Sequence, residues 1–424
     1  MTEVSPAAIP ASHQAPAAAC RFCGAGLVHT FVDLGMSPLC QTQIARDQLD
    51  QGENFYPLHV YVCDRCWLVQ LREYVRPDVI FSRNYPYFSS FSDSWVEHAR
   101  RYVEETIAEF GLGRSSFVVE LASNDGYLLQ HVVRAGIRCL GVEPTASTAT
   151  AAVAKGIPTL QEFFGVALAR RVAAEQGQAD LVCGNNVLAH VPDLNDFVAG
   201  IAALLKPGGV GTFEFPHLLR LMENNQFDTI YHEHFSYFSL TTIRAVFARH
   251  GLDLFDVREL ATHGGSIRIY VQPRAAGRPV HPRVGGLLAI EEQAGLTGLA
   301  VYGRFQERVH ATKRELLGFL IGARNAGKRV AGYGAPGKGN TLLNYCGIGT
   351  DLLDFTVDRN PAKKGTWTPG TRIPILDPDV ILERRPDYVL ILPWNLKDEI
   401  TRKMAAIRDW GGQFVLPIPT VEIV

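Results

Sequence analysis

A cluster of proton-carrying side chains lies in the middle of the chain, at Tyr231-His232-Glu233-His234. Each of these side chains can carry a proton or bind a metal, and Phe235, Tyr237 and Phe238 follow directly. Burial of ionisable groups among aromatic rings shifts their pKa values, and general acid–base catalysis uses such shifts. We therefore expect a reaction centre here. A chance polar cluster on a surface loop is the alternative.

The two histidines of this cluster could also bind a metal. In an extended segment His232 and His234 point to one side, with Glu233 opposite. The HExxH spacing of a helical zinc site does not occur, so we expect acid–base chemistry here rather than a second metal site.

The composition is typical of a soluble globular protein, with 424 residues, 47% hydrophobic and 20% charged. This length exceeds one hydrophobic core, so two or three domains are expected. The net charge of −2 gives no reason to expect nucleic acid, and no apolar run approaches the roughly 18 residues of a membrane span. Residues 1–19 are rich in Ala and Pro and lack the features of a signal peptide, which predicts a disordered leader and a cytoplasmic protein.

Two CxxC pairs near the start of the chain predict a metal site: Cys20 with Cys23, and Cys63 with Cys66. Each pair places two thiolates on one tight knuckle, and two knuckles complete a tetrahedral zinc site with no position left for water. We expect a structural Zn²⁺ in a domain spanning 20–80, with a subdomain looping out between the pairs. Unmetallated thiols or two redox pairs are the alternative. The other cysteines are scattered, as expected in a reducing compartment: Cys40, Cys139, Cys183 and Cys346.

Short apolar runs in the middle of the chain predict a parallel α/β sheet. Phe117–Leu121 is the first buried strand, followed by a polar turn, Ala122–Gly126, and a helix from Tyr127. Open α/β sheets bind ligands at such turns, at the carboxyl ends of strands. A second strand, Arg138–Val142, ends in Glu143, an acid that could bind a ribose. Further strands are predicted at Asp180–Cys183 and Val210–Phe215, with Leu205–Gly209 as the stop before the latter.

The turn itself limits the kind of ligand. It holds one glycine, which is a poor match to a dinucleotide fingerprint, and the chain has no P-loop here. Glu120, near the end of the first strand, would repel a pyrophosphate but suit a cationic ligand, such as one carrying an α-amino group. A carboxylate that only caps or packs is the alternative for Glu120.

This segment resembles the S-adenosylmethionine-dependent methyltransferases of class I. The shared features are Val119–Gly126, the acid Glu143, the strand end Cys183–Asn186 and the segment Leu205–Gly209. Members of this class often have glycine where this chain has Ala122. The resemblance implies S-adenosylmethionine as cofactor, with Glu120, Ala122, Asn124, Gly126 and Asn185 on the methionine side, Glu143 at the ribose and Phe163, in Glu162-Phe163-Phe164, at the adenine.

A second α/β unit is predicted towards the C-terminus. A helical pattern over Gly285–Ala326 leads into Lys328–Asn340, which predicts a strand, a glycine turn and a helix. Taken alone, this pattern indicates a nicotinamide-dinucleotide site, with Lys338 facing a phosphate and Asp358 a ribose. Further strands are expected at Leu353–Asp358 and Asp387–Leu392, and surface charges at Lys363 and Arg372.

The order of these parts resembles the nucleotide-linked deoxysugar C-methyltransferases of antibiotic-sugar pathways, over nearly the whole chain from Cys20. Members of that family methylate a ring carbon next to a ketone, in a sugar carried on thymidine diphosphate (TDP). The resemblance implies that the C-terminal unit lacks a redox cofactor and helps to bind the nucleotide sugar. The matching residues are Tyr85 in Asn84-Tyr85-Pro86-Tyr87, His190 in Leu188-Ala189-His190-Val191-Pro192, Tyr231, Glu233 and His234, and His263-Gly264-Gly265-Ser266-Ile267-Arg268.

The same resemblance implies roles for these side chains. A carbon next to a ketone becomes a nucleophile only after a base removes its proton and an enolate forms. His234 is the expected base, and Glu233 is expected to orient an imidazole or hold a sugar hydroxyl. Tyr85, His190 and Tyr231 are expected to face the enolate oxygen or the sugar. The expected substrate ligands are Tyr87, His263, Arg268, Tyr333 and Lys338.

We therefore expect an α/β enzyme with a leader, a zinc-binding domain, a cofactor-binding methyltransferase domain over 81–284 and a Rossmann-like domain over 285–424. Its expected state is a monomer or weak homo-oligomer, acting on a TDP-linked keto-deoxysugar with no nucleic acid or membrane partner. Two alternatives stay open. One is an NAD(P)-dependent oxidoreductase using the C-terminal glycine turn, and the other is a non-catalytic nucleotide-sugar-binding zinc protein.

Overall fold

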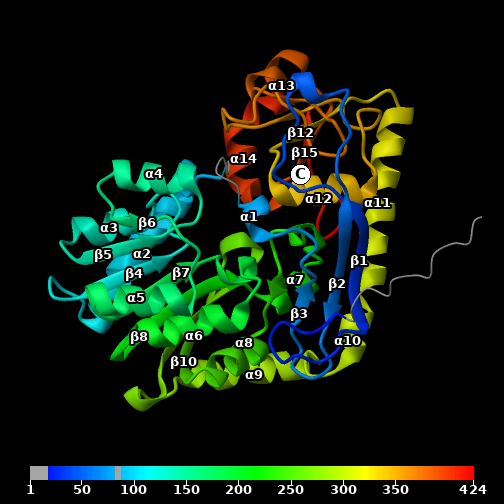
Figure 1. Cartoon of the computed structure of the whole chain (residues 1–424). Helices are drawn as coiled ribbons and strands as arrows, with labels where there is room; N and C mark the ends of the chain where they lie inside the picture. The colour runs from blue at the N-terminus through cyan, green and yellow to red at the C-terminus, as the bar shows by residue number, and fades with distance from the viewer. Residues whose placement is uncertain (1–17, 82–86) are drawn as a thin grey trace, which may run out of the picture.

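The computed structural model describes residues 18–81 and 87–424. Tyr85, an expected acceptor ligand, lies outside these residues. In the described part the chain builds three β-sheets, which Figure 1 shows as an N-terminal sheet, a central sheet with helices on both faces and a C-terminal sheet. The predicted α/β class, with a zinc-binding segment and two doubly wound units, is confirmed.

The N-terminal sheet contains a strand from far along the chain. Its order is β1-β2-β3-β9, and β9 follows the polar cluster at residues 231–234 directly. Val69 of β3 pairs with Tyr237 of β9 in antiparallel register. The segment that carries the cluster is therefore fixed to the sheet that follows the first cysteine pair. The bounds are β1 (His29–Ser37), β2 (Tyr56–Val62), β3 (Val69–Leu71) and β9 (Ser236–Tyr237).

The central sheet has the order β10-β11-β8-β7-β4-β5-β6. Only β11 runs antiparallel to its neighbours, so the carboxyl ends of the parallel strands share one edge. The first two predicted strands are confirmed residue for residue as β4 and β5. The bounds are β4 (Phe117–Leu121), β5 (Arg138–Val142), β6 (Thr159–Leu160), β7 (Ala179–Asn185), β8 (Leu205–Pro216), β10 (Leu252–Leu260) and β11 (Ser266–Pro273).

The predicted stop at Leu205–Gly209 separates helix α6 (Leu194–Leu204) from the regular part of β8, but it is an irregular start of the strand. Strand β8 begins at Leu205 itself, where Leu205 pairs with Ala179 of β7. The next pair is Val210 with Leu181, so the register shifts in between, where a Cβ on Gly209 would lie 2.8 Å from the Ala179 carbonyl oxygen. The glycine thus serves close strand approach, which the turn-like sequence concealed.

The C-terminal sheet has the order β14-β13-β12-β15-β16-β17, parallel except for β17. Its strand β12 leads through the glycine turn into helix α12, as predicted. The bounds are β12 (Val330–Tyr333), β13 (Thr356–Val357), β14 (Ile375–Leu376), β15 (Tyr388–Ile391), β16 (Gln413–Leu416) and β17 (Glu422–Ile423).

The helices cover these sheets, and one expected helix is in fact three. The pattern over 285–326 is divided into α9, α10 and α11. Gly295, with a φ of +83°, lies between α9 and α10, and Arg304 separates α10 from α11. Val284 and Leu287 of α9 pack in the methyltransferase core, so the boundary drawn at 284/285 cuts a helix of that core. The bounds are α1 (Pro77–Ile80), α2 (Asp93–Phe110), α3 (Leu129–Arg134), α4 (Ala146–Ala154), α5 (Val166–Gln176), α6 (Leu194–Leu204), α7 (Leu218–Glu223), α8 (Leu240–Arg249), α9 (Pro282–Gln293), α10 (Leu299–Gly303), α11 (Phe305–Asn325), α12 (Gly337–Cys346), α13 (Asp379–Arg384) and α14 (Lys397–Lys403).

The chain between β1 and β2 docks onto the C-terminal unit. Ile44 and Trp367 exchange two backbone hydrogen bonds of 2.9 Å. Arg372 donates to the Gln51 carbonyl oxygen at 2.7 Å and pairs with Glu53 at 3.2 Å. The expectation that Arg372 is an ordinary surface charge is therefore wrong, because it holds two distant segments together. The subdomain that loops out between the cysteine pairs thus joins two of the sheets.

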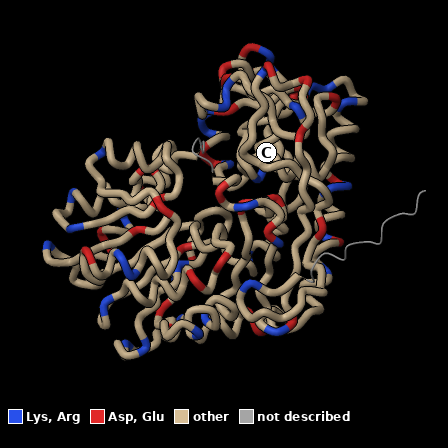
Figure 2. Tube along the Cα trace, viewed as in Figure 1, with Lys and Arg blue, Asp and Glu red and all other residues tan. Residues whose placement is uncertain are grey.

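Charge is spread evenly over the molecule. Figure 2 shows Lys and Arg positions interspersed with Asp and Glu positions along the trace. Within residues 18–81 and 87–424, none of the helices combines the length and the hydropathy that crossing a membrane requires.

Candidate active site and zinc centre

The four cysteines of the two CxxC pairs come together as predicted. Their sulfur atoms all lie within 4.8 Å of one another, and the Cys20–Cys66 and Cys23–Cys63 Sγ distances are both 3.5 Å. All four are free thiols, and each of these two contacts joins one CxxC pair to the other. Four converging thiolates suit a tetrahedral Zn²⁺ with structural coordination.

The polar turn after β4 surrounds an uncompensated carboxylate. Glu120 is completely buried, and neither of its carboxylate oxygens has a hydrogen-bond partner among the described residues. Its burial, followed by the nearby charges of Glu143 and Asp125, raises the pKa of Glu120 well above its usual range. A buried group in this state calls for a cationic partner. The α-amino group and sulfonium of S-adenosylmethionine fit that requirement.

The backbone of this turn explains an unusual residue. Ala122, Asn124 and Gly126 all have positive φ angles, of 54°, 49° and 77°. Glycine adopts such angles without strain, which accounts for the glycine that related enzymes often have at the Ala122 position. At Gly126 a Cβ would lie 2.2 Å from a methyl carbon of Ile157, so only glycine fits there. The turn is held in a strained shape, as is common at ligand sites.

Glu143 holds the turn from the next strand. Its carboxylate accepts 2.9 Å hydrogen bonds from the backbone N–H groups of Asn124 and Thr145. A carboxylate offers about four acceptor positions, so Glu143 can also meet a ribose hydroxyl. Phe163 lies just beyond β6 with 53% of its surface exposed, as a side chain waiting to cover an adenine ring would be. Its role in adenine binding stays a prediction.

The end of strand β7 offers two further polar groups. The amide nitrogen of Asn185 and the amide oxygen of Asn186 are buried without partners among the described residues. Asn186 also has a positive φ of 56°. Asn185 was an expected cofactor ligand, whereas Asn186 was not singled out. Its position beside Asn185 at a strand end was the available sign.

His234 lies in an aromatic and imidazole cluster. Its Nδ1 atom lies 2.9 Å from the Thr229 carbonyl oxygen. A carbonyl can only accept, so Nδ1 carries the proton and Nε2 keeps a free lone pair. The ring centroid of Tyr231 is 4.0 Å away and that of His190 is 4.7 Å away. The expected base is therefore brought together with two of its three expected neighbours.

Both imidazoles of this cluster are kept neutral. Burial lowers the pKa of His190 to about 4. Burial also lowers the pKa of His234 well below its usual range, and the charges of His190 and Lys338 act in the same direction. A neutral imidazole at pH 7 is ready to accept a proton.

The other members of the polar cluster point to different partners. His232 lies with Nε2 3.2 Å from the Pro57 carbonyl oxygen, so it faces the N-terminal sheet. Glu233 is buried, with one oxygen 3.5 Å from the thiol of Cys40. The two histidines therefore do not converge on a common metal.

The expected substrate ligands divide into two groups. His263 has a buried Nδ1 without a partner among the described residues, and burial lowers the pKa of His263 to about 4. Lys338 donates to the Asn395 side chain at 2.8 Å, and its Nζ lies 4.3 Å from the ring centre of Trp394. Tyr87 has 46% of its surface exposed. These three residues stay candidates for binding an acceptor.

Arg268 and Tyr333 are engaged inside the protein instead. Arg268 is 3% exposed, forms an ion pair with Glu214 and lies over the ring of Tyr102 at 4.2 Å. Tyr333 is buried in the apolar core of the C-terminal sheet, beside Phe355. Arg268 thus already has a charged partner within the fold, and contact of either residue with substrate stays a prediction.

One important residue of this region was not foreseen. Asp228 is completely buried; its Oδ2 accepts a 2.7 Å hydrogen bond from the Trp394 indole, and its Oδ1 has no partner among the described residues. Burial raises the pKa of Asp228 to about 6, although Lys338 opposes the shift. Asp228 thus lies where the central and C-terminal units meet, next to the Thr229 carbonyl.

The glycine turn of the C-terminal unit packs closely against other segments of the chain. A Cβ on Gly337 would lie 3.0 Å from the Cys40 sulfur, and one on Gly334 would lie 2.6 Å from Pro393. The carboxylate of Asp358 accepts the Ala335 N–H at 2.8 Å, so it already has a partner. Lys363 donates to the Ala335 carbonyl oxygen at 2.7 Å and is buried, which corrects its expected place on the surface.

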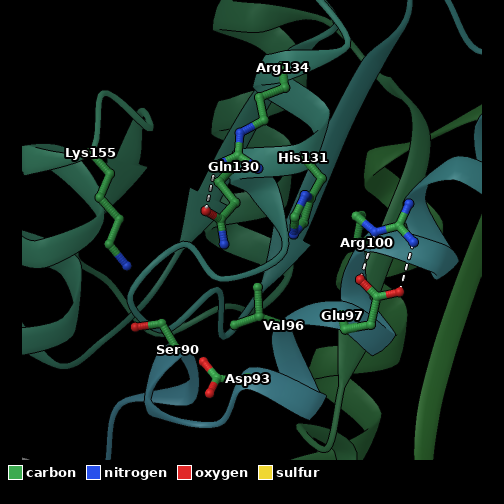
Figure 3. Close-up of a pocket in the computed structure, with 9 residues that line it drawn as sticks. All are labelled: Ser90, Asp93, Val96, Glu97, Arg100, Gln130, His131, Arg134 and Lys155. Carbon is green, nitrogen blue, oxygen red and sulfur yellow. Dashed lines mark hydrogen bonds and ion pairs between the residues drawn. The ribbon is translucent and has the colours of Figure 1, made fainter.

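A pocket of about 410 Å³ is lined by residues of α2, α3 and the end of α4, and Figure 3 shows their side chains. Some of its charged groups are in ion pairs, since Arg100 pairs with Glu97 and Lys155 with Asp125. The pocket lacks the imidazoles and phenols of the cluster around His234, so it is not the reaction centre. Its lining is Ser90, Asp93, Val96, Glu97, Arg100, Gln130, His131, Arg134 and Lys155.

Comparison with known proteins matches all three parts of this arrangement. Residues 20–81 match a zinc binding domain, 95–257 a methyltransferase domain and 261–419 a C-methyltransferase C-terminal domain. C-methyltransferase NovU of Streptomyces niveus is 39% identical over 408 residues, which is 96% of each chain. The chain belongs to this family of C-methyltransferases. It is a methyltransferase enzyme that uses S-adenosylmethionine and has a zinc-binding domain.

Solved structures overlap with the methyltransferase over part of its length. Magnesium protoporphyrin IX methyltransferase from Synechocystis, with bound SAH, is 16% identical with a TM-score of 0.34, covering 42% of this chain and 84% of its own. A SAM-dependent methyltransferase from Anabaena variabilis is 13% identical with a TM-score of 0.35, covering 42% of this chain and 87% of its own.

Proposed function

We propose that this enzyme methylates a ring carbon next to the ketone of a TDP-linked keto-deoxysugar, in the cytoplasm, during the synthesis of an antibiotic deoxysugar. The observation that carries the proposal is the imidazole of His234. It is neutral, its Nε2 atom carries the lone pair, and phenol and imidazole groups lie beside it. A neutral imidazole can remove a proton from carbon, and the neighbouring phenol and imidazole groups can stabilise the enolate that forms.

The proposed reaction begins with proton transfer from the carbon to Nε2 of His234. The negative charge that develops on the ketone oxygen is stabilised by hydrogen bonds from Tyr231 and His190, with Tyr85 as a further donor. When bound, S-adenosylmethionine supplies an electrophilic methyl group on its sulfonium. The protein contributes by holding the enolate carbon in line with that group, which converts binding energy into rate.

The low pKa of His234 is compatible with this role. A base with a depressed pKa is a weak base in isolation, so proton removal must be assisted. The enolate forms next to the imidazolium, and the attraction of the two opposite charges in a buried site favours the proton transfer. Donors aimed at the ketone oxygen lower the pKa of the carbon acid at the same time.

The nucleotide part of the substrate is proposed to lie between the central and C-terminal units. Lys338 offers a positive charge beside His234, whose pKa it helps to lower. A lysine ammonium binds phosphate as a point charge. His263 and Tyr87 are proposed to contact the sugar or nucleotide. Glu233 is proposed to hold a sugar hydroxyl.

The test is a transfer assay with methyl-labelled S-adenosylmethionine and a set of TDP-linked keto-deoxysugars. We expect the label in the sugar, bonded to a ring carbon next to the former ketone, as carbon NMR would establish. Transfer to oxygen or nitrogen, or to no keto-sugar of the set, would contradict the proposal. In parallel, NAD(P) should not bind, because the C-terminal glycine turn packs closely against Pro393 and Cys40.

A further inference from the structure

Cys40 brings the zinc-binding domain to the reaction centre. It lies between β1 and β2, is 3% exposed, and its Sγ is 3.5 Å from Oε1 of Glu233. Glu233 is 5% exposed. The two residues are separated by 193 positions in the sequence. The contact therefore exists only because the N-terminal domain is folded against the polar cluster.

The thiol is fixed in place from two sides. Its backbone carbonyl oxygen accepts a 2.7 Å hydrogen bond from the Asn340 side chain of α12. Its sulfur packs against Gly337 at the start of the same helix, where a Cβ would approach it to 3.0 Å. Four residues further on, Ile44 is paired with Trp367. The sulfur thus has little freedom to leave Glu233.

The chemistry of the pair assigns the donor. A carboxylate only accepts hydrogen bonds, whereas a protonated thiol donates one. Burial raises the pKa of Cys40 well above its usual range, and the charge of Glu233 acts in the same direction. The group is therefore a neutral S–H at physiological pH. A buried donor of this kind orients a carboxylate without neutralising it.

We propose that Cys40 is a positioning residue, whose S–H donates to Oε1 of Glu233 and holds that carboxylate towards the acceptor. The inference rests on the proposed function, in which Glu233 binds a sugar hydroxyl beside His234. It gives the zinc-binding domain a part in the reaction, since the thiol belongs to that domain and its target to the methyltransferase domain.

The kinetic test separates hydrogen bonding from packing. Cys40→Ser keeps a donor, whereas Cys40→Ala and Cys40→Val remove it with a smaller and a larger side chain. We expect kcat/KM for the keto-sugar to fall about tenfold in the Ala and Val variants and to stay within about threefold in the Ser variant. The Kd for S-adenosylmethionine should stay within about twofold in all three, because the cofactor turn is not touched.

Two controls make the result specific. Cys346→Ser and Cys346→Ala alter a different buried thiol, at the end of α12, and neither should change kcat/KM. In a Glu233→Ala background, Cys40→Ala should cause no further loss, because the acceptor of its hydrogen bond has already been removed. Equal losses in the Ser, Ala and Val variants, or additive losses in the double variant, would overturn the positioning role.

A spectroscopic measurement tests the contact without any sugar. The S–H stretching band of Cys40 is obtained by subtracting the infrared spectrum of the Cys40→Ala variant from that of the unaltered enzyme. Glu233→Gln should shift this band towards that of a weaker hydrogen bond, and an unchanged band would overturn the proposal. If the enzyme methylates no keto-sugar, the proposed function fails, but the S–H band still shows whether Cys40 donates to Glu233. The comparison between the unaltered enzyme and Glu233→Gln also stands if the Ala variant does not fold.

Discussion

The Nδ1–H of His234 donates to the carbonyl oxygen of Thr229 across 2.9 Å. This bond fixes the tautomer that leaves Nε2 able to accept a proton. A carbonyl oxygen is uncharged, so it orients the ring but stabilises an imidazolium less than a carboxylate would. The effect of burial on the pKa of His234 therefore exceeds that of this hydrogen bond, and the pKa is low. The base is thus set by backbone geometry, which substitution of a neighbouring side chain cannot remove.

Replacing His234 by Gln should abolish catalysis and spare cofactor binding. We expect kcat to fall roughly 10²–10⁴-fold, because the proton acceptor is lost. The measurement is methyl transfer together with solvent deuterium incorporation at the sugar carbon, which reports proton removal even when no methyl is transferred. A variant that keeps more than about a tenth of the rate would refute the assignment. The Kd for S-adenosylmethionine serves as the control.

The pH profile of kcat/KM should lack the decrease near pH 6.5 that an ordinary histidine base would cause. Burial holds the pKa of His190 at about 4 and that of His234 well below its ordinary value of 6.5, so both stay neutral in moderately acidic solution. We expect kcat/KM to stay level from neutral pH down to about 5. An acid limb near 6.5 that disappears in His234→Gln would contradict this expectation.

The same shifts predict a loss of stability in acid. The unfolded chain binds protons at these histidines below pH 6.5, whereas the folded protein does so only at lower pH. The folded state therefore loses stability as the pH falls from about 6.5 towards 4. Thermal unfolding followed across this range should show a falling Tm, and the slope should be smaller in a His190→Gln variant. An equal slope in the two proteins would argue against a neutral His190.

Replacing Glu120 by Gln should weaken the binding of S-adenosylmethionine and stabilise the protein without cofactor. The carboxylate is fully buried with no partner among the described residues, so its charge costs free energy until a cation arrives. We expect the Kd for S-adenosylmethionine to rise roughly 10–100-fold, by calorimetry, and the Tm of the empty protein to rise. Glu143→Gln is the matched control and should lower the Tm, because Glu143 accepts hydrogen bonds from the turn. A lower Tm in Glu120→Gln would show that its charge is already compensated.

Asp228 should limit stability at neutral pH. Burial raises the pKa of Asp228 from 3.8 to about 6, so between these pH values the folded state binds more protons than the unfolded state. The free energy of unfolding therefore falls as the pH rises through this range. Asp228→Asn should therefore be more stable than the unaltered enzyme at pH 7.5, by roughly 1–3 kcal/mol, and lose this advantage near pH 4. Asp228→Ala, which removes the acceptor of the Trp394 indole, should instead be less stable. Denaturant unfolding at the two pH values measures both.

Removal of zinc should damage catalysis more than cofactor binding. The four sulfurs hold the domain whose strand β3 pairs with β9, next to the polar cluster. We expect a strong chelator to release one zinc per chain, to lower the Tm and to reduce kcat, while the Kd for S-adenosylmethionine changes little. Full activity of a zinc-free protein would contradict this coupling. A Cys139→Ser variant, outside the four-sulfur cluster, should keep its zinc.

The local patterns of the sequence were sufficient for much of the fold. The strands Phe117–Leu121 and Arg138–Val142 are short apolar runs bounded by turns, and the structure reproduces both. The CxxC spacing likewise predicted the sulfur cluster. Gly295 and Gly298 lie close together in the sequence and indicated a break between helices. The helical periodicity on either side concealed this break.

Contacts between distant segments could not be predicted in this way. Nothing near Asp228 or Cys40 in the sequence distinguishes them, because their partners Trp394 and Glu233 lie 166 and 193 positions away. The ion pair of Arg268 is a further example, since its partner Glu214 is 54 positions away on a neighbouring strand. A charged side chain in a motif is ambiguous until its burial is known.

The pairing of β9 with β3 has a consequence for how such enzymes can be recombined. A chimera that takes its zinc-binding domain from one relative and the remainder from another would have to rebuild a shared sheet and the thiol–carboxylate contact beside it. Cofactor binding would survive such an exchange, whereas acceptor turnover would not. Inheritance of this site therefore depends on the first and second domains being passed on as one piece.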